Sequence, residues 1–455
     1  MKTLALFNAS FNPPGLHHRR IVDELARQFD AVVVVPNGPR PDKPTVNDTR
    51  PIDRAALADL AFGDSPARVD LFDLEAERFT RTHQLDDRYA NEGEVWHVVA
   101  AEQVRGGARG QSLIHRLWQQ GAELWADARF GVVCRPHEPL DAADLPPHSR
   151  TITVDHSGSA ADIRNRAFQH RPIDGLVAPR VADYVRRRGL FRAGPTAHEV
   201  RWRPPAERLL IVADERNAAA VRAAEAFRDR AHDDPDLVLV FGGDGTMLHA
   251  IRQHWRLRRP FFGVNTGHVG FLLNQDAPGS LTSEELMLYQ LPLLRAEVET
   301  ADGMVREAVA FNDAWVERAA GQTAWVEVRV DGVVRLPKVV ADGALVATAA
   351  GSTSYARALG APPLPYHTPA LLLVGSNVLA PSHWRPVVLG LDAEVELRTL
   401  DPVKRPLQGY IDGVAQGEVR ALRVRVSRTA AVELAFRATH DPASKLARLQ
   451  FPDGG

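Results

Sequence analysis

One ten-residue segment, 237–246, constrains this chain more than any other, because an unbroken apolar run passes directly into a cluster of glycines. Residues 237–241 predict a buried strand, three glycines within 242–245 predict a tight turn, and residues 247–255 predict a helix. Backbone N–H groups at such a turn, together with the positive end of the helix, favour phosphate oxygens. The segment therefore predicts a phosphate-binding cradle.

A carboxylate stands inside this turn. Asp244 would repel a bare phosphate, so it needs another task, either taking a proton from a substrate hydroxyl or holding Mg²⁺. The alternative is an ordinary tight connection in which Asp244 caps the helix.

Three further segments follow in order: Gly263–Leu272, Phe311–Asp313, and Asp342–Tyr355, which ends in Gly-Ser-Thr-Ser-Tyr. In this order and spacing, the four segments resemble the NAD kinase family, which transfers the γ-phosphoryl of a phosphate donor to the 2′-hydroxyl of the NAD adenosine ribose. The resemblance covers about residues 208–451. Lipid kinases of the diacylglycerol type share the Gly-Gly-Asp-Gly-Thr loop, but the Gly-Thr-Gly-Asn-Asp type of segment that follows it there has no counterpart here.

The resemblance assigns roles by position. It implies that Asp244 is the catalytic acid that draws the proton from the 2′-hydroxyl. It implies that the phosphate donor is bound by Gly242, Gly243 and Thr246. The residues expected to bind NAD are Gly245, Phe271, Asn312, Asp313, Asp342, Thr353, Ser354, Tyr355 and Asp412. The competing interpretations are structural: glycine turns, a core phenylalanine, an Asx turn after a strand, and a type I′ hairpin turn at Asp412.

The family's chemistry also implies Mg²⁺ or another divalent cation, with ATP or polyphosphate as donor, and a homo-oligomer assembled through the β domain. We assign no residue as a metal ligand. The chain departs from the family's usual Thr-Pro-Thr-Gly-Ser at residues 348–352, which read Thr-Ala-Ala-Gly-Ser, and Val340 stands where arginine is common. These differences bear on substrate affinity and donor preference. The choices between ATP and polyphosphate and between NAD and NADH stay open.

The first signature of the N-terminal region, Ser10–His18, resembles that of nicotinamide/nicotinate mononucleotide adenylyltransferases, Ser-Phe-Asn-Pro-Pro-His-x-Gly-His. In that family both histidines stabilise charge on the ATP phosphates. Here Gly15 replaces the first histidine and His17 the glycine, and the later motif at 158–164 lacks its threonine. The resemblance implies a Rossmann-like nucleotidyltransferase domain over residues 1–192, with a nucleotide site at Phe11, Asn12, His17, His18, Lys43, Ser159 and Arg164.

Three functional interpretations follow. The chain is an NAD kinase carrying an adenylyltransferase-like domain that is a nucleotide-binding or structural remnant. Alternatively it is bifunctional, making NAD or its deamido form and then NADP. An interpretation of another class is a non-catalytic NAD(P)-binding regulatory protein.

Patterning divides the chain into five parts. Residues 1–192 alternate strand-like and helix-like segments, which predicts an α/β domain with a parallel sheet, and 193–206 are proline-rich without apolar period, which predicts a linker. The kinase fold then comprises an α/β lobe at 207–294, a mostly β domain at 295–427 and a closing segment at 428–455 that returns to the lobe.

Composition excludes several other classes. With 55 basic and 57 acidic residues the formal charge is −2, so no overall basic field attracts nucleic acid or an anionic membrane. Cys134 is the only cysteine, which excludes an internal disulfide framework and a multi-cysteine metal site. No stretch approaches the ~18 apolar residues of a membrane span. We therefore expect a cytoplasmic enzyme of small molecules without an export signal.

Overall fold

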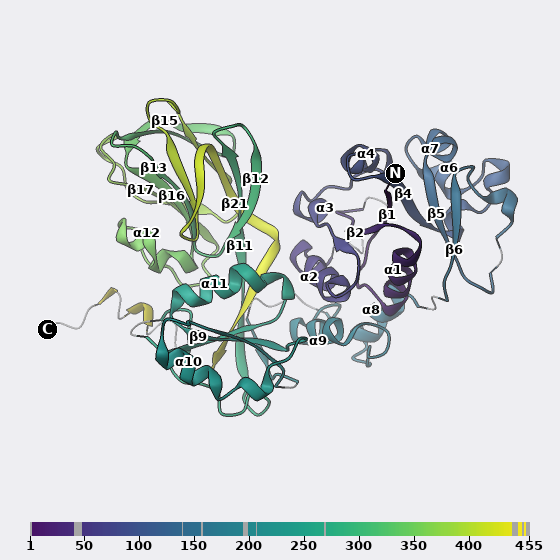
Figure 1. The fold of residues 1–455 in the computed structure, drawn as a ribbon, viewed down its shortest axis with the longest axis horizontal. Coiled ribbons are helices and arrows are strands. Elements are labelled where there is room, and N and C mark those ends of the chain that lie inside the picture. The colour runs from purple at the N-terminus through teal and green to yellow at the C-terminus, as the bar shows by residue number, and fades with distance from the viewer. Residues whose placement is uncertain are drawn as a thin grey trace. The chain divides into compact units, whose positions relative to one another are not determined.

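The computed structural model describes residues 2–40, 48–138, 140–155, 158–193, 199–205, 207–267, 270–438, 445–447 and 450–451. The chain forms two compact units, residues 1–197 and 198–455. In Figure 1 the first unit runs from purple to blue and the second from teal to yellow. No helix among the described residues is long and apolar enough to cross a bilayer.

The N-terminal unit is built on six parallel strands in the order β3-β2-β1-β4-β5-β6. Consecutive side chains of β1 and β2 enter cores on opposite faces, which explains why both strands are almost entirely apolar. The strand order reverses between β1 and β4, and in such sheets the ligand crevice lies at the carboxyl ends beside this point. The strands are β1 (Thr3–Ala9), β2 (Ala31–Pro36), β3 (Arg68–Val69), β4 (Glu94–Ala100), β5 (Arg129–Cys134) and β6 (Ser149–Thr153).

Helices cover this sheet. The first, α1 (Leu16–Gln28), buries Ile21, Val22 and Leu25 at helical spacing and therefore packs one side onto the strands. The others are α2 (Pro51–Phe62), α3 (Phe72–Glu75), α4 (Thr82–Tyr89), α5 (Ala101–Val104), α6 (Leu113–Leu117), α7 (Gly121–Asp127), α8 (Ala160–Phe168) and α9 (Pro179–Arg188). The predicted α/β domain with a parallel sheet is confirmed.

The second unit begins with a smaller α/β lobe of parallel strands β8 (Leu209–Ala213), β9 (Leu237–Gly242) and β10 (Phe261–Asn265). Helices α10 (Ala218–Glu225) and α11 (Asp244–His254) lie on opposite sides of β9 (Figure 1). Alternate residues of β9 face each of them, since Val238 and Val240 share a core with α11 while Leu239 and Phe241 share one with α10.

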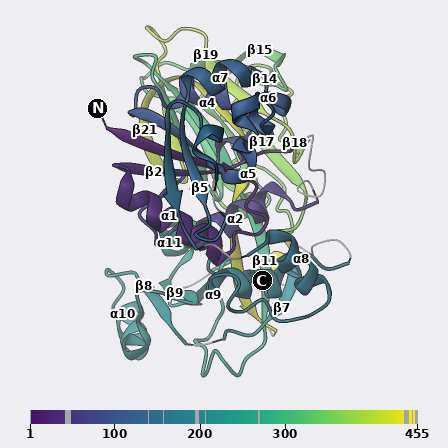
Figure 2. The same ribbon diagram turned by 90° about the vertical axis from the view of Figure 1, so that its right-hand side faces the viewer.

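Two long antiparallel strands, β11 (Leu286–Thr300) and β21 (Val414–Arg437), run from this lobe into the β region (Figure 2). The expected boundaries at 294/295 and 427/428 therefore fall inside single strands. The structure also differs from the expected linker at 193–206, because β7 (Glu199–Trp202) pairs with β11 and buries Trp202 in the core of the lobe. One buried aromatic side chain thus holds a proline-flanked segment in the sheet.

The rest of the unit is mostly β, as predicted. Its strands follow the order β15-β14-β19-β21-β20-β13-β16-β17-β18. Every second residue of β14 and β19 is buried, which matches their alternating sequences. The remaining elements are β12 (Val305–Ala310), β13 (Asp313–Arg318), β14 (Ala324–Val330), β15 (Val333–Ala341), β16 (Gly343–Thr348), α12 (Tyr355–Ala358), β17 (Ala370–Ser376), β18 (Val387–Gly390), β19 (Val395–Thr399) and β20 (Leu407–Ile411).

Candidate functional site

The predicted phosphate cradle lies where β9 ends and α11 begins. A Cβ atom added to Gly242 would lie 2.3 Å from Thr246 Oγ1, so packing fixes that glycine. A Cβ added to Gly243 or Gly245 would meet nothing within 4 Å. Packing does not require glycine at these two positions, and both leave open space beside the positive end of α11. This is the geometry in which a phosphate group approaches backbone N–H groups.

Asp244 is the first residue of α11, and its carboxylate is held by a distant loop. Phe271 N–H donates to Oδ2 and Leu272 N–H donates to Oδ1, each at 2.9 Å. The N-cap of α11 is Gly243, so the simple capping interpretation does not describe this carboxylate. Burial raises the pKa of Asp244 above its usual range, although both amides and the nearby Lys445 favour the anion. Such a carboxylate is a stronger base than an exposed one.

A second cluster forms between β12 and β13 and at the β20–β21 hairpin. The carboxylate of Asp412 accepts the N–H groups of Phe311 (2.7 Å), Asn312 (2.8 Å) and Asp313 (3.2 Å). Asp412 and Gly413 both have positive φ, as a type I′ turn requires, so the turn and this contact coexist. Burial and then the Asp412 charge raise the pKa of Asp313 to about 7. The buried Asn312 Oδ1 has no hydrogen-bond partner among the described residues.

The loop after β16 packs against this cluster. Thr348 Oγ1 donates to Phe311 O at 2.8 Å and accepts from Gly351 N–H at 3.0 Å. A Cβ on Gly351 would lie 2.2 Å from Asn312 O, so only glycine permits this approach. Thr353, Ser354 and Tyr355 continue from this close contact. The structure thus brings the Asn-Asp pair and the Gly-Ser-Thr-Ser-Tyr loop together.

Asp342 is not in this group. It precedes β16 and pairs with Arg318 at 2.6 Å, and it accepts from Asn377 Nδ2 at 2.8 Å. Asp313 lies in β13 and pairs with Ala347, which is at the other end of β16 from Asp342. At the usual rise per residue these ends are about 17 Å apart. The predicted NAD contact at Asp342 stays a prediction that the geometry within one chain does not support.

Two residues near Asp244 were not predicted. Lys445 Nζ donates to Gly270 O and to Leu273 O, each at 2.8 Å. The Tyr366 hydroxyl donates to Phe271 O. Both bind the loop that holds Asp244. The available sequence signal was weak: Lys445 is the only lysine of the predicted closing segment.

In the N-terminal unit, four predicted residues lie between the carboxyl end of β1 and the first turn of α1: Phe11, Asn12, His17 and His18. His18 Nδ1 accepts Gly15 N–H at 3.0 Å, and the rings of His17 and His18 are 3.9 Å apart. A Cβ on Gly15 would lie 2.5 Å from His17 Cε1 and Nδ1, and one on Gly158 would lie 2.6 Å from His17 Nδ1. The His17 imidazole therefore occupies the space beside position 15, and two glycines make that possible.

The other predicted residues of this group contact the same loop or cap a neighbouring helix. Arg164 Nη1 donates to Asn12 O at 2.6 Å, Ser159 Oγ caps α8, and Phe11 is buried in an edge-to-face contact with His18. Lys43 lies outside the described residues. The buried atoms Asn8 Nδ2, Ser10 Oγ, Asn12 Oδ1 and Asn37 Oδ1 have no hydrogen-bond partner in the described part of the chain. Unsatisfied polar atoms at this end of the sheet suit a polar ligand.

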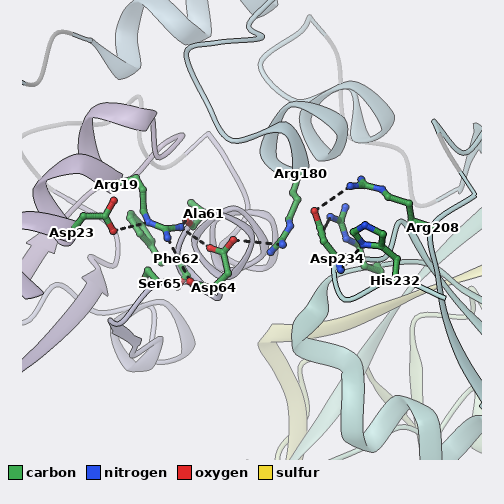
Figure 3. Close-up of polar contacts among 11 residues, drawn as sticks. Arg19, Asp23, Ala61, Phe62, Asp64, Ser65, Arg180, Arg208, His232 and Asp234 are labelled. Atoms are coloured by element: carbon green, nitrogen blue, oxygen red, sulfur yellow. Dashed lines mark hydrogen bonds and ion pairs between the residues drawn. The ribbon is translucent and has the colours of Figure 1, made fainter. Parts of the chain in front are cut away.

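The first turn of α1, which carries His17 and His18, is bound through Arg19, whose contacts Figure 3 shows. Its Nε pairs with Asp23 at 3.0 Å and its Nη1 pairs with Asp64 at 2.6 Å. Nη1 also donates to Ala61 O at 3.3 Å. These bonds tie the first turn of α1 to the end of α2.

Comparison with known proteins identifies the family of the chain. The profile described as "ATP-NAD kinase N-terminal domain" matches residues 177–280. The NAD kinase of Rhizorhabdus wittichii is 36% identical over 54% of this chain and 98% of its own length. Those of Rickettsia bellii (32% identity, 48% of this chain, 87% of the relative) and Xanthomonas campestris pv. campestris (34%, 51% and 92%) are also similar. The chain belongs to the NAD kinase family.

Proposed function

We propose that the second unit phosphorylates the 2′-hydroxyl of the NAD adenosine ribose to give NADP. The observation that carries this proposal is Asp244, a half-buried carboxylate of raised pKa that two loop amides hold beside an open glycine turn. In the reaction the 2′-oxygen forms a bond to the terminal phosphorus of the donor, the bond from that phosphorus to its bridging oxygen breaks, and Asp244 accepts the hydroxyl proton.

The surrounding residues bind and orient the substrates. Gly243 and Gly245 leave room for the donor phosphates against the start of α11. Asp313, whose pKa is raised to about 7, is partly protonated at neutral pH, and its protonated form can donate a hydrogen bond, while the unpartnered Asn312 Oδ1 can accept one. This donor–acceptor pair suits the polar edge of a nucleoside.

A divalent cation such as Mg²⁺ neutralises charge on the donor phosphates in reactions of this kind. The described residues contain no group of three or more side chains suited to holding a metal ion. We propose that the cation is bound chiefly by donor oxygens. Assembly through the β region, residues 295–427, also remains a proposal.

The direct test uses the purified chain with NAD, ATP and Mg²⁺, and with polyphosphate in place of ATP. We expect NADP, identified by its 2′-phosphate, with at least one donor. If NAD is bound but neither donor yields NADP, the chain is a binding protein, and the kinase proposal fails.

We further propose that the N-terminal unit binds a mononucleotide and ATP and transfers the adenylyl group weakly. The position of His17 over Gly15 favours this, because an imidazole still stands beside the start of α1. The mononucleotide phosphate would attack the α-phosphorus of ATP and release pyrophosphate. Ala161, where the signature has threonine, lacks a hydroxyl, and loss of one such donor typically costs ~10²–10³-fold in rate.

The test is dinucleotide formation from ATP and either nicotinamide or nicotinate mononucleotide. The double variant Gly15→His/His17→Gly, which restores the family spacing, is the comparison. We expect it to be faster than the wild type. A wild-type turnover on the order of 1 s⁻¹ or more would show that His17 fully replaces the missing histidine, and no dinucleotide from either protein would leave a nucleotide-binding domain.

A further inference from the structure

The loop at Gly270–Leu273 connects Asp244 to two other side chains through its peptide groups. The peptide that joins Gly270 to Phe271 accepts from Lys445 Nζ at its carbonyl (2.8 Å) and donates to Asp244 Oδ2 at its N–H (2.9 Å). The next peptide accepts from the Tyr366 hydroxyl at its carbonyl and donates to Asp244 Oδ1 at its N–H (2.9 Å). Each carboxylate oxygen therefore has its own relay to a distant donor.

Such a chain of bonds has a directional effect. A donor at the carbonyl oxygen polarises the peptide and makes its N–H a better donor, and hydrogen bonds to an ionised carboxylate are the strong ones. Lys445 adds a positive charge to the first relay and holds a third point of the loop through Leu273 O. The three side chains come from the start of α11, from the segment after α12, and from the closing segment of the chain.

We propose that Lys445 and Tyr366 are positioning residues for the kinase reaction, which hold the 270–273 loop so that its amides aim the Asp244 carboxylate and set its basicity. This inference rests on the proposed kinase function. Neither residue needs to touch substrate. A purely structural role would instead tie the closing segment to the lobe and affect only stability.

The charges facing Asp244 support one sign for the effect. Burial raises the pKa of Asp244, the two amides lower it, and Lys445 is the nearby cation that also lowers it. Burial, the Asp244 charge and Tyr289 raise the pKa of Tyr366, so its phenol stays neutral. Further along α11, Arg252 acts on Asp412 instead. Removing the Lys445 charge should therefore make the Asp244 anion less favourable and require a higher pH to form it.

The experiment compares kcat against pH for the full-length wild type, Lys445→Gln, Lys445→Arg and Tyr366→Phe. Lys404→Gln is the matched control, because Lys404 is exposed in the β region. We expect the acid limb of Lys445→Gln to move to higher pH, with a several-fold loss of kcat below the wild-type midpoint and near-normal kcat on the plateau. Lys445→Arg should restore the profile, and Tyr366→Phe should shift it in the same direction by less.

Two results would overturn the inference. One is an unchanged pH profile in both Lys445→Gln and Tyr366→Phe. The other is a uniform loss of kcat at every pH together with a lower melting temperature, which a structural anchor would give. If Lys445→Gln does not fold, Tyr366→Phe, which removes one hydroxyl, decides the matter by the same criterion. A wild type that makes no NADP refutes the kinase proposal itself, which is a distinguishable result.

Discussion

The two units place different chemistry on the same local geometry. In each, a buried parallel strand is followed by a helix whose N-cap is a glycine: Gly15 for α1 and Gly243 for α11. The first helix begins with imidazoles, which can stabilise phosphate charge, whereas the second begins with Asp244, which phosphate would repel. The carboxylate is tolerated because two loop amides bind it. The same turn therefore favours a phosphate-stabilising role in one unit and a proton-accepting role in the other.

The two glycines also differ in what restricts them. At position 15 the space that a side chain would enter is filled by His17, whereas at position 243 that space is empty. Packing against His17 therefore requires glycine at position 15, whereas packing does not require it at position 243. Three experiments test this contrast. They separate the two units, titrate the buried Asp313, and replace Gly243 and Gly15 by alanine.

The largest expected effect comes from where the chain is cut. A fragment starting at residue 199 should fold and make NADP, whereas one starting at 207 loses β7 and the buried Trp202. Removing a large buried aromatic side chain costs about 3–5 kcal/mol, much of a typical domain's stability. Thermal unfolding and NADP formation check both fragments. A soluble but inactive 199–455 fragment that residues 1–192 reactivate would show that the units share a site.

A smaller effect concerns Asp313. Its pKa of about 7, raised by burial and by Asp412, means that the folded protein keeps this proton while the unfolded chain loses it near its ordinary value of 3.8. Because the folded state binds the extra proton, the free energy of unfolding falls as pH rises from about 4 to about 7. From pH 5 to 8 the loss should be on the order of 3 kcal/mol.

Asp313→Asn should lack that loss. Urea unfolding of ligand-free protein at pH 5 and pH 8 measures it, with the exposed Asp229→Asn as the matched control. Equal pH dependence in wild type and Asp313→Asn would show that this carboxyl is not held neutral.

The smallest expected effect is on the stability of two variants, Gly243→Ala and Gly15→Ala. Gly243→Ala should change stability by less than about 0.5 kcal/mol, because its Cβ meets no protein atom within 4 Å. It should nevertheless raise KM for the donor about tenfold, or 1.4 kcal/mol of binding. Gly15→Ala should destabilise its own unit by about 1–3 kcal/mol through overpacking against His17. Calorimetry and donor titration measure both. A destabilised Gly243→Ala with normal KM would place the donor elsewhere.

Local sequence patterns predicted much of the fold. The predicted β domain contains strands such as 324–330 and 395–399, in which every second residue is buried, and β9, its glycine turn and α11 follow the predicted order. The strand β7 was missed because its four residues, which lie between prolines, carry no apolar period. Its pairing with the distant strand β11 and the burial of Trp202 place it in the sheet.

The residues of the candidate site were harder to predict from the sequence, for a physical reason. Asp244 was singled out because a carboxylate among glycines is unusual. Tyr366 and Lys445 bind backbone carbonyls 95 and 175 residues away in sequence, and any residue can supply a carbonyl. Such contacts leave no pattern around the residue that is bound. Asp342 is the opposite case. It was predicted from a matching motif, but within one chain it does not lie near Asp313.

The central claim is that Asp244 is the proton acceptor of an NAD kinase. The most direct measurement is the rate of NADP formation by Asp244→Asn, beside the same exchange at the exposed Asp229 of the same lobe. The amide keeps the shape but cannot accept the proton, so turnover should fall by roughly 10²–10⁴-fold, with NAD affinity and melting temperature nearly unchanged and Asp229→Asn fully active. An Asp244→Asn protein that retains more than about a tenth of wild-type turnover, far above the loss expected of a missing general base, would contradict the account.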